Sequence, residues 1–161
     1  MVRFELARPD DVEGLVAAAL SAFADEARKY GHYPPGLAAL ERHLEAMREG
    51  VYYKIVAEGR IVGGIMIAGL GEGRYKLDTI YVEAGYQNRG IGAQAMTFIE
   101  QAIPAKRWTL KTPATSYQNH HFYEKLGYKK VRVAAPEEYP DDPNVLSFFI
   151  YEKEMGLVIG N

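Results

Sequence analysis

The 161-residue sequence has no cysteine, which excludes disulfides, thiolate metal ligands and a cysteine nucleophile. It also has no basic excess, since 19 Lys and Arg residues stand against 21 Asp and Glu residues, a formal net charge of -2. A general nucleic-acid binder would normally be basic, so we expect no nucleic-acid partner, although a local basic patch stays open.

Long hydrophobic runs are missing as well. The N-terminal stretch MVRFELARPDD has no apolar signal core, and the apolar run at 61–70 is too short to span a bilayer. We therefore expect no membrane partner and a cytoplasmic location, which the lack of cysteine also fits. The four histidines are scattered or adjacent without ligand spacing, so no metal site is expected.

The remaining composition is that of an ordinary globular protein, with 48% hydrophobic and 25% charged residues. Neither an internal repeat nor a linker interrupts the chain. The length suits one hydrophobic core, so we predict a single domain over residues 1–161.

Apolar spacing and turn residues predict the element order β-α-α-β-β-β-α-β-α-β-β. The expected strands are 2–6, 51–58, 60–70, 74–83, 107–112, 128–134 and 145–155, and the expected helices are 8–31, 37–50, 91–103 and 116–127. Asp10 and Glu13 resemble a capping box for the first helix. Short glycine-containing connectors favour antiparallel hairpins, whereas strands 74–83 and 107–112 flank a helix and should be parallel. The fold class is α+β, a mixed and mostly antiparallel sheet flanked by helices.

The stretch YQNRGIGAQA (86–95) places two glycines, Gly90 and Gly92, at the start of a predicted helix. One interpretation is packing, in which the glycines ease a strand-to-helix turn. The other is an anion site, because the first N–H groups of a helix have no internal partner and the helix dipole favours negative charge. The stretch by itself does not choose between them.

The order of elements, QNRGIG (87–92) and FYEKLGY (122–128) together resemble the GNAT superfamily of N-acetyltransferases. The first motif fits the family's phosphate loop, and the second fits its aromatic-Tyr and Gly-aromatic signature. The resemblance implies a GNAT-like fold over nearly the whole chain and acetyl-CoA as cosubstrate. It also implies direct acetyl transfer to a primary amine without a covalent enzyme intermediate, and it favours the anion site at the loop.

By this resemblance, the N–H groups of residues 88–93 hold the pyrophosphate of CoA, and the main chain of the fourth strand, at a bulge, holds the acetyl carbonyl. Arg89 adds charge near the phosphates or is simply solvent-exposed. The expected CoA-binding residues are Ile80, Tyr81, Val82, Gln87, Asn88, Arg89, Gly90, Ile91, Gly92, Ala93 and Asn119. Many relatives carry their asparagine where this chain has Ser116, which leaves the role of Asn119 open.

Tyr123 matches the family's tyrosine and is our candidate for the general acid that protonates the CoA thiolate; the alternative is a core aromatic residue. Asp78 is the candidate base or acceptor-binding group, and Glu83 is its rival. The structural alternative is that Asp78 only forms an ion pair with a lysine or arginine on a neighbouring strand. His120 and His121 lie beside Tyr123, yet one of the two must point away from the site, and neither is favoured as a base.

The acceptor is not identified by the sequence. Aromatic and acidic residues in segments that border the expected pocket suit a small cationic amine, while a protein amine remains an alternative. These residues are Tyr30, Tyr33, Tyr117, Phe148, Phe149, Asp25, Glu26, Asp78 and Glu83, with His32 in the same loop as Tyr33. A non-catalytic CoA sensor is the alternative from another class. The apolar last strand suits either the core or a homodimer edge.

Overall fold

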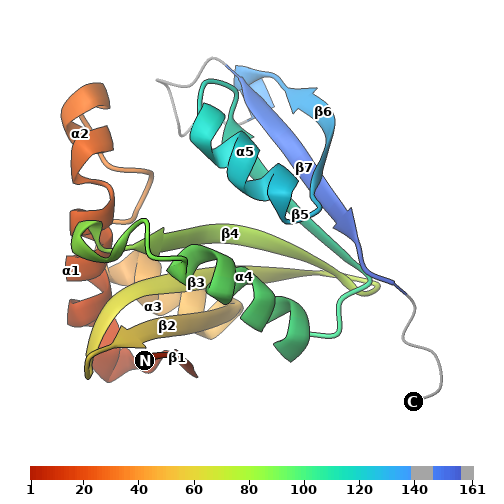
Figure 1. Cartoon of the computed structure of the whole chain (residues 1–161). Coiled ribbons are helices and arrows are strands. Elements are labelled where there is room, and N and C mark those ends of the chain that lie inside the picture. The colour runs from red at the N-terminus through yellow and green to blue at the C-terminus, as the bar shows by residue number, and fades with distance from the viewer. Residues whose placement is uncertain (139–146, 157–161) are drawn as a thin grey trace. The chain divides into compact units, whose positions relative to one another are not determined.

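The computed structural model describes residues 1–138 and 147–156 (Figure 1). Three short 3-10 turns, Pro9–Asp11, Ala84–Tyr86 and Pro136–Glu138, accompany the helices and strands. The helices are α1 (Val12–Ala22), α2 (Ala24–Tyr30), α3 (Leu40–Glu49), α4 (Ile91–Ala102) and α5 (Tyr117–Lys125). The strands are β1 (Val2–Leu6), β2 (Val51–Ala57), β3 (Arg60–Gly71), β4 (Arg74–Val82), β5 (Arg107–Pro113), β6 (Lys129–Ala134) and β7 (Phe148–Glu154).

The strands form one seven-stranded sheet in the order β1-β2-β3-β4-β5-β7-β6. The pairs β1/β2, β2/β3, β5/β7 and β6/β7 are antiparallel. β4 and β5 run parallel, with Arg74 opposite Arg107 and Lys76 opposite Thr109. The mixed, mostly antiparallel sheet and its parallel pair around α4 are therefore confirmed.

The chain divides into two compact units. The first unit comprises Met1–Ala68 and Asp78–Ile103, and the second comprises Gly69–Leu77 and the chain from Pro104 onward. Each unit is described by itself below, and the single domain over residues 1–161 stays a prediction.

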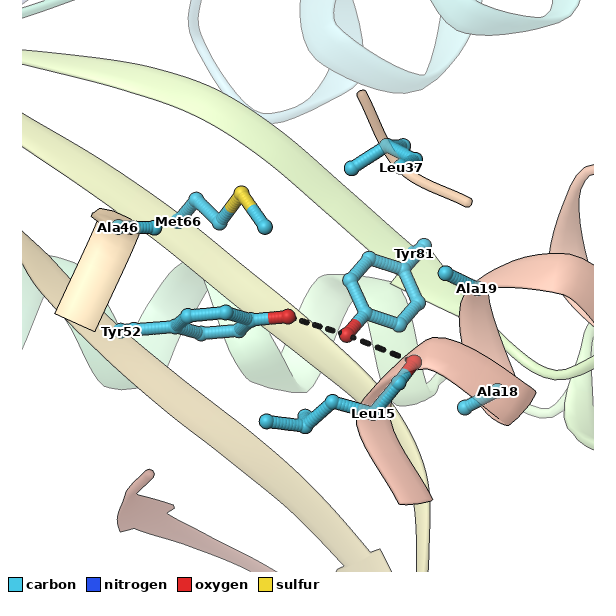
Figure 2. Close-up of a cluster of buried hydrophobic side chains, with 8 residues drawn as sticks. All are labelled: Leu15, Ala18, Ala19, Leu37, Ala46, Tyr52, Met66 and Tyr81. Atoms are coloured by element: carbon cyan, nitrogen blue, oxygen red, sulfur yellow. Dashed lines mark hydrogen bonds between the residues drawn. The ribbon is translucent and has the colours of Figure 1, made fainter. Parts of the chain in front are cut away.

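In the first unit, side chains of β2 pack against helices on both faces of the sheet, because successive side chains of a strand point to opposite faces. Tyr52 is buried in a cluster with residues of α1, α3, β3 and β4 (Figure 2). Its neighbour Tyr53 points to the other face, where its ring meets Phe98 of α4 edge-on at 4.9 Å between centroids. Phe98 also stacks on Phe4 of β1 at 5.0 Å. These contacts anchor α4, and with it the glycine loop at its start.

The core of the second unit is aromatic. Trp108 of β5, Tyr128 after α5 and Tyr151 of β7 are almost fully buried. A smaller cluster joins Ala134 to Phe148 and Ile150 across the β6/β7 pair. This packing supports one side of α5, the helix that carries the second motif.

The structure corrects the predicted first helix, which is two helices joined at Phe23. The ring of Phe23 lies 6.4 Å from that of Tyr81, so burial of this side chain accompanies the break. The expected capping pair at Asp10 and Glu13 is wrong too. Pro9 starts a 3-10 turn, and Asp11 accepts a hydrogen bond from the N–H of Arg8 at 2.8 Å.

Two further boundaries differ from the sequence prediction. The second predicted helix begins three residues late, at Leu40, because Leu37 and Ala39 close turns onto the carbonyls of Pro34 and Gly36. The last strand starts at Phe148. Residues 145–146, the first of the predicted strand, lie outside the described residues, as does most of the loop before them.

Candidate active site

The first unit holds the predicted phosphate loop between β4 and α4. After the 3-10 turn Ala84–Tyr86, the side-chain amide of Gln87 donates through Nε2 to the carbonyl of Val82 at 2.8 Å, which fixes the start of the loop. Asn88 and Gly90 both have left-handed backbone conformations, with φ of +63° and +80°. Such values suit Gly and Asn best, and here they turn the chain directly into the helix.

The loop leaves a run of main-chain donors without partners. The first helical hydrogen bond runs from the N–H of Gln94 to the carbonyl of Gly90 at 3.1 Å. The N–H groups of residues 88–93 donate to no acceptor in the part of the chain that the structure describes. Consecutive free donors at a helix N-terminus, with the positive end of the helix dipole, form a site for an anion. The loop is therefore suited to the pyrophosphate of CoA, which is the group that these residues would hold.

Arg89 adds a positive charge beside these donors. Its guanidinium carbon lies 4.9 Å from the ring centroid of Tyr86, and the hydroxyl of Tyr86 donates to Glu58 at 2.8 Å. Within residues 1–138 and 147–156, Arg89 forms no ion pair. The stacked ring therefore supports the guanidinium while its charge stays available to a phosphate. Tyr86 was not predicted as a site residue. Its position three residues before Arg89 is the feature of the sequence that could have indicated this contact.

Glu83, the rival base, is already engaged. Arg60 of β3 binds both of its carboxylate oxygens, one of them at 3.1 Å. The N–H of Glu83 also donates to the carbonyl of Val62 at 2.7 Å. Arg60 therefore holds the Glu83 carboxylate through two charge-assisted hydrogen bonds. Asp78 is half-buried on β4, and both carboxylates stay candidates.

The main chain of β4 that is expected to receive the acetyl carbonyl is closely packed against β3. A Cβ atom added to Gly63 would lie 2.2 Å from the carbonyl oxygen of Tyr81, so only glycine fits there. By strand alternation Ile80 and Val82 point to the face opposite the buried ring of Tyr81. The bulge expected in this segment stays a prediction.

The second unit holds Tyr123 on α5. Its side chain is buried, with ring centroids of Phe122, Tyr128 and Tyr151 at 5.1, 5.9 and 6.4 Å. Among the described residues, no hydrogen bond of its hydroxyl is found. Burial raises the pKa of Tyr123 above its usual value, so the phenol keeps its proton near neutral pH. A protonated, unpartnered hydroxyl is the arrangement that a proton donor requires.

Asn119 lies one turn before Tyr123 on the same helix. Its side-chain amide donates to the hydroxyl of Thr112 in β5 at 3.2 Å. Thr112 is buried, and this contact, which the sequence did not indicate, fixes the direction of an otherwise exposed amide. Ser116 begins the helix without a side-chain cap. The choice between Asn119 and Ser116 for the family asparagine's role stays open.

The histidines have structural surroundings. His120 is hydrogen-bonded through Nε2 to the carbonyl of Pro113 at 2.9 Å, and its ring stacks on Phe149 at 4.7 Å. His121 is exposed on the same helix. In the first unit His32 uses Nδ1 to contact the carbonyl of Tyr33 at 2.8 Å, while its Nε2 is enclosed without a partner among the described residues.

Residues 15–128 match the model of the acetyltransferase (GNAT) family, which is more than half of the chain. The chain belongs to the GNAT acetyltransferase family. This confirms the resemblance found in the sequence, and it makes the protein an acyltransferase of the N-acetyltransferase type. Family and fold together support acyl transfer from acetyl-CoA to an amine. No curated protein sequence matches this chain.

Solved structures of GNAT proteins share the fold at low sequence identity. The ribosomal-protein-S18-alanine N-acetyltransferase from Escherichia coli has a TM-score of 0.80 and 14% identity, over 100% of this chain and 98% of that one. The PaiA N-acetyltransferase from Thermoplasma acidophilum, solved with coenzyme A, gives 0.77 and 16%, over 96% and 99%. A GNAT family acetyltransferase from Elizabethkingia anophelis with acetyl-CoA bound gives 0.71 and 15%, over 96% and 98%. Similar structures at this identity confirm the GNAT fold.

No helix among the described residues is long and apolar enough to cross a membrane. No group of three or more His, Asp or Glu side chains in the same residues is arranged to hold a metal ion.

Proposed function

We propose that this GNAT protein acetylates the primary amine of a small molecule, with the loop at residues 88–93 binding acetyl-CoA. The observation that supports this most strongly is the run of unpartnered N–H donors at the start of α4. Arg89 adds its charge there, and Gln87 holds the loop in place through Val82. In this proposal, these contacts bind the cosubstrate through its diphosphate.

In this proposal the chemistry is divided among three groups. Asp78 binds the acceptor or takes the proton from its ammonium form, since an alkylamine with a pKa of about 10 is mostly protonated at neutral pH. Main-chain N–H groups of Ile80–Val82 stabilise the oxyanion as the amine attacks the carbonyl. Tyr123 then gives its proton to the departing thiolate. The raised pKa of Tyr123 keeps that proton in place until the thiolate forms.

The acceptor is proposed to be a small cationic amine, and the contacts and burial of the candidate residues support some of them more than others as its binding groups. Asp25 is already paired with Arg28 on α2, which reduces its value as an attracting charge. Phe148 is buried in the core of its own unit, whereas Tyr117 is among the most exposed aromatic side chains. Tyr117 is therefore the better candidate of the two aromatic residues, Asp78 stays a candidate for the ammonium group, and a protein amine is the alternative acceptor. We place the reaction in the cytoplasm, as expected from the sequence, and leave a homodimer as a hypothesis.

The loop assignment is tested by Gly92→Trp, with CoA binding measured by calorimetry. An indole in the first turn of α4 fills the space in front of the donors, so binding should be abolished. Thr97→Trp is the matched control, because it places the same bulk on the exposed face of the same helix. CoA binding that survives in Gly92→Trp would contradict the loop assignment. CoA binding by the wild type without turnover of any amine would favour the non-catalytic sensor.

A further inference from the structure

A buried chain of hydrogen bonds crosses the core of the first unit, and Figure 2 shows its part from Tyr52 through Tyr81 to Leu15. His43 of α3 contacts the carbonyl of Leu37 through Nε2 at 2.9 Å and the hydroxyl of Tyr52 through Nδ1 at 2.7 Å. The hydroxyls of Tyr52 and Tyr81 lie 2.5 Å apart, and that of Tyr81 also reaches the carbonyl of Leu15 in α1 at 3.3 Å. The chain therefore connects α3, β2, β4 and α1 through side chains that are at most 3% exposed.

The positions of the protons follow from the acceptors. A carbonyl only accepts, so Nε2 of His43 carries a hydrogen and donates it to Leu37. Burial lowers the pKa of His43, which leaves the ring neutral and Nδ1 as an acceptor. Tyr52 then donates to Nδ1, and the single proton of the Tyr81 hydroxyl is shared between two acceptors, the Tyr52 oxygen and the carbonyl of Leu15. Burial raises the pKa of both phenols, so they keep their protons.

The end of the chain at Tyr81 is held with little free space. A Cβ atom on Gly64 would lie 2.5 Å from the hydroxyl oxygen of Tyr81 and 2.8 Å from Cε1 of Tyr52. A Cβ atom on Gly63 would lie 2.2 Å from the Tyr81 carbonyl oxygen. The two glycines of β3 thus allow close contact with both the ring and the main chain of one β4 residue. Fixing the Tyr81 side chain therefore also restricts its main chain.

This polar chain lies in an apolar cluster that includes Leu15, Ala18, Ala19 and Met66. Well-packed apolar side chains of similar shape would often be as stable there, because each buried polar group loses its contacts with water. Polar groups that are fully paired do specify one arrangement, since any shift leaves a buried partner unsatisfied. Its directional bonds make this chain better suited to positioning than to general stabilisation.

We propose that His43, Tyr52 and Tyr81 are positioning residues that fix the main chain of Ile80–Val82 for the acetyl carbonyl. The proposal rests on the proposed function, in which this segment supplies the N–H groups that polarise the thioester. The three side chains are buried in the core of the first unit. They act through the strand, because Tyr81 belongs to the segment whose donors must point at the carbonyl.

The test uses Tyr81→Phe and Tyr52→Phe, which keep both rings and break the same hydroxyl–hydroxyl bond from opposite ends. The readout is the infrared stretch of acetyl-CoA labelled with ¹³C at the carbonyl, because a hydrogen bond to a carbonyl lowers its frequency. In both variants the bound carbonyl should lose part of the wild-type shift. Turnover should fall about 3- to 10-fold, the range of one misplaced hydrogen bond, while the affinity for CoA itself stays unchanged.

Tyr53→Phe is the control, since this hydroxyl on the other face of β2 has no partner among the described residues. It should keep both the carbonyl shift and the turnover. Tyr81→Phe and Tyr52→Phe could instead keep the full carbonyl shift of the wild type. That result would overturn the positioning role and leave the proposed function intact. Wild-type protein that fails to bind acetyl-CoA would instead contradict the proposed function. If either Tyr81→Phe or Tyr52→Phe does not fold, the other variant still tests the proposal, because both substitutions remove the same hydroxyl–hydroxyl hydrogen bond.

Discussion

Replacing Gly90 with alanine separates the strain of the loop from its role in binding CoA. Gly90 has a φ of +80° and stands directly before α4. A Cβ atom there would meet nothing within 4 Å, so the substitution adds no clash. What it adds is the cost of a left-handed conformation, about 1–2 kcal/mol for an L-residue. For a chain of this size that corresponds to a fall in Tm of about 2–8 °C.

The loss of binding should exceed this loss of stability. If alanine relaxes toward negative φ, the peptide between residues 90 and 91 rotates and its N–H group leaves the direction of the phosphates. One hydrogen bond to a charged group is worth about 1.5–3 kcal/mol, so the Kd for CoA should rise by at least about tenfold. Isothermal titration calorimetry gives the Kd, and thermal unfolding gives the Tm of the same preparation.

Gly71→Ala is the matched control for this experiment. Gly71 has a φ of +87° and also has nothing within 4 Å of an added Cβ, yet it lies in the turn between β3 and β4. It should lose the same stability and keep the wild-type affinity. A Gly90→Ala variant that binds CoA within twofold of Gly71→Ala would refute the assignment of the free donors to the phosphates.

Three other substitutions test the remaining groups. Tyr123→Phe should keep CoA binding and lower turnover about 10- to 100-fold or more in a thiol-release assay, and unchanged turnover would leave Tyr123 with a structural role alone. Asp78→Asn should move the acidic limb of the pH–rate profile; an unchanged profile would remove Asp78 as base and as ligand of the acceptor's ammonium. The pKa of His43 is lowered from 6.5 by burial, so the unfolded chain binds a proton that the folded one does not, and stability falls as the pH drops below about 6.5. Urea titrations at several pH values give the free energy of unfolding. In His43→Gln its dependence on pH should lack the contribution of this histidine, up to about 1.4 kcal/mol per pH unit. Parallel stability–pH curves for the variant and the wild type would contradict this prediction.

Much of the fold could be predicted from local patterns. The boundaries of β2 and β3 were predicted to within a residue or two. Their hydrophobic pattern and the glycine-containing turns between them indicate the same boundaries. The first helix was wrong for the opposite reason. Its apolar spacing continues through Phe23, and only the contact with Tyr81 on a distant strand accompanies the break.

The candidate site shows the same division. The free donors of residues 88–93 could be anticipated, since glycines before a helix imply them and the family resemblance gave them a ligand. The pairing of Arg60 with Glu83 and of Asn119 with Thr112 could not, because each joins segments that only the tertiary structure brings together. The chain from His43 to Tyr81 was missed for this reason as well. His43 and Tyr81 are 38 positions apart in the sequence. Hydrophobic periodicity links only residues within one helix or strand, so it does not connect these two.

The most direct test of the account is thiol release from acetyl-CoA with a panel of polyamines, aminosugars, amino acids and short peptides, followed by mass spectrometry of each acceptor. The account predicts that at least one small amine gains a single acetyl group for each CoA released, and that Gly92→Trp abolishes this reaction while Thr97→Trp keeps it. Wild-type protein that neither binds CoA nor transfers the acetyl group to any amine would contradict the account.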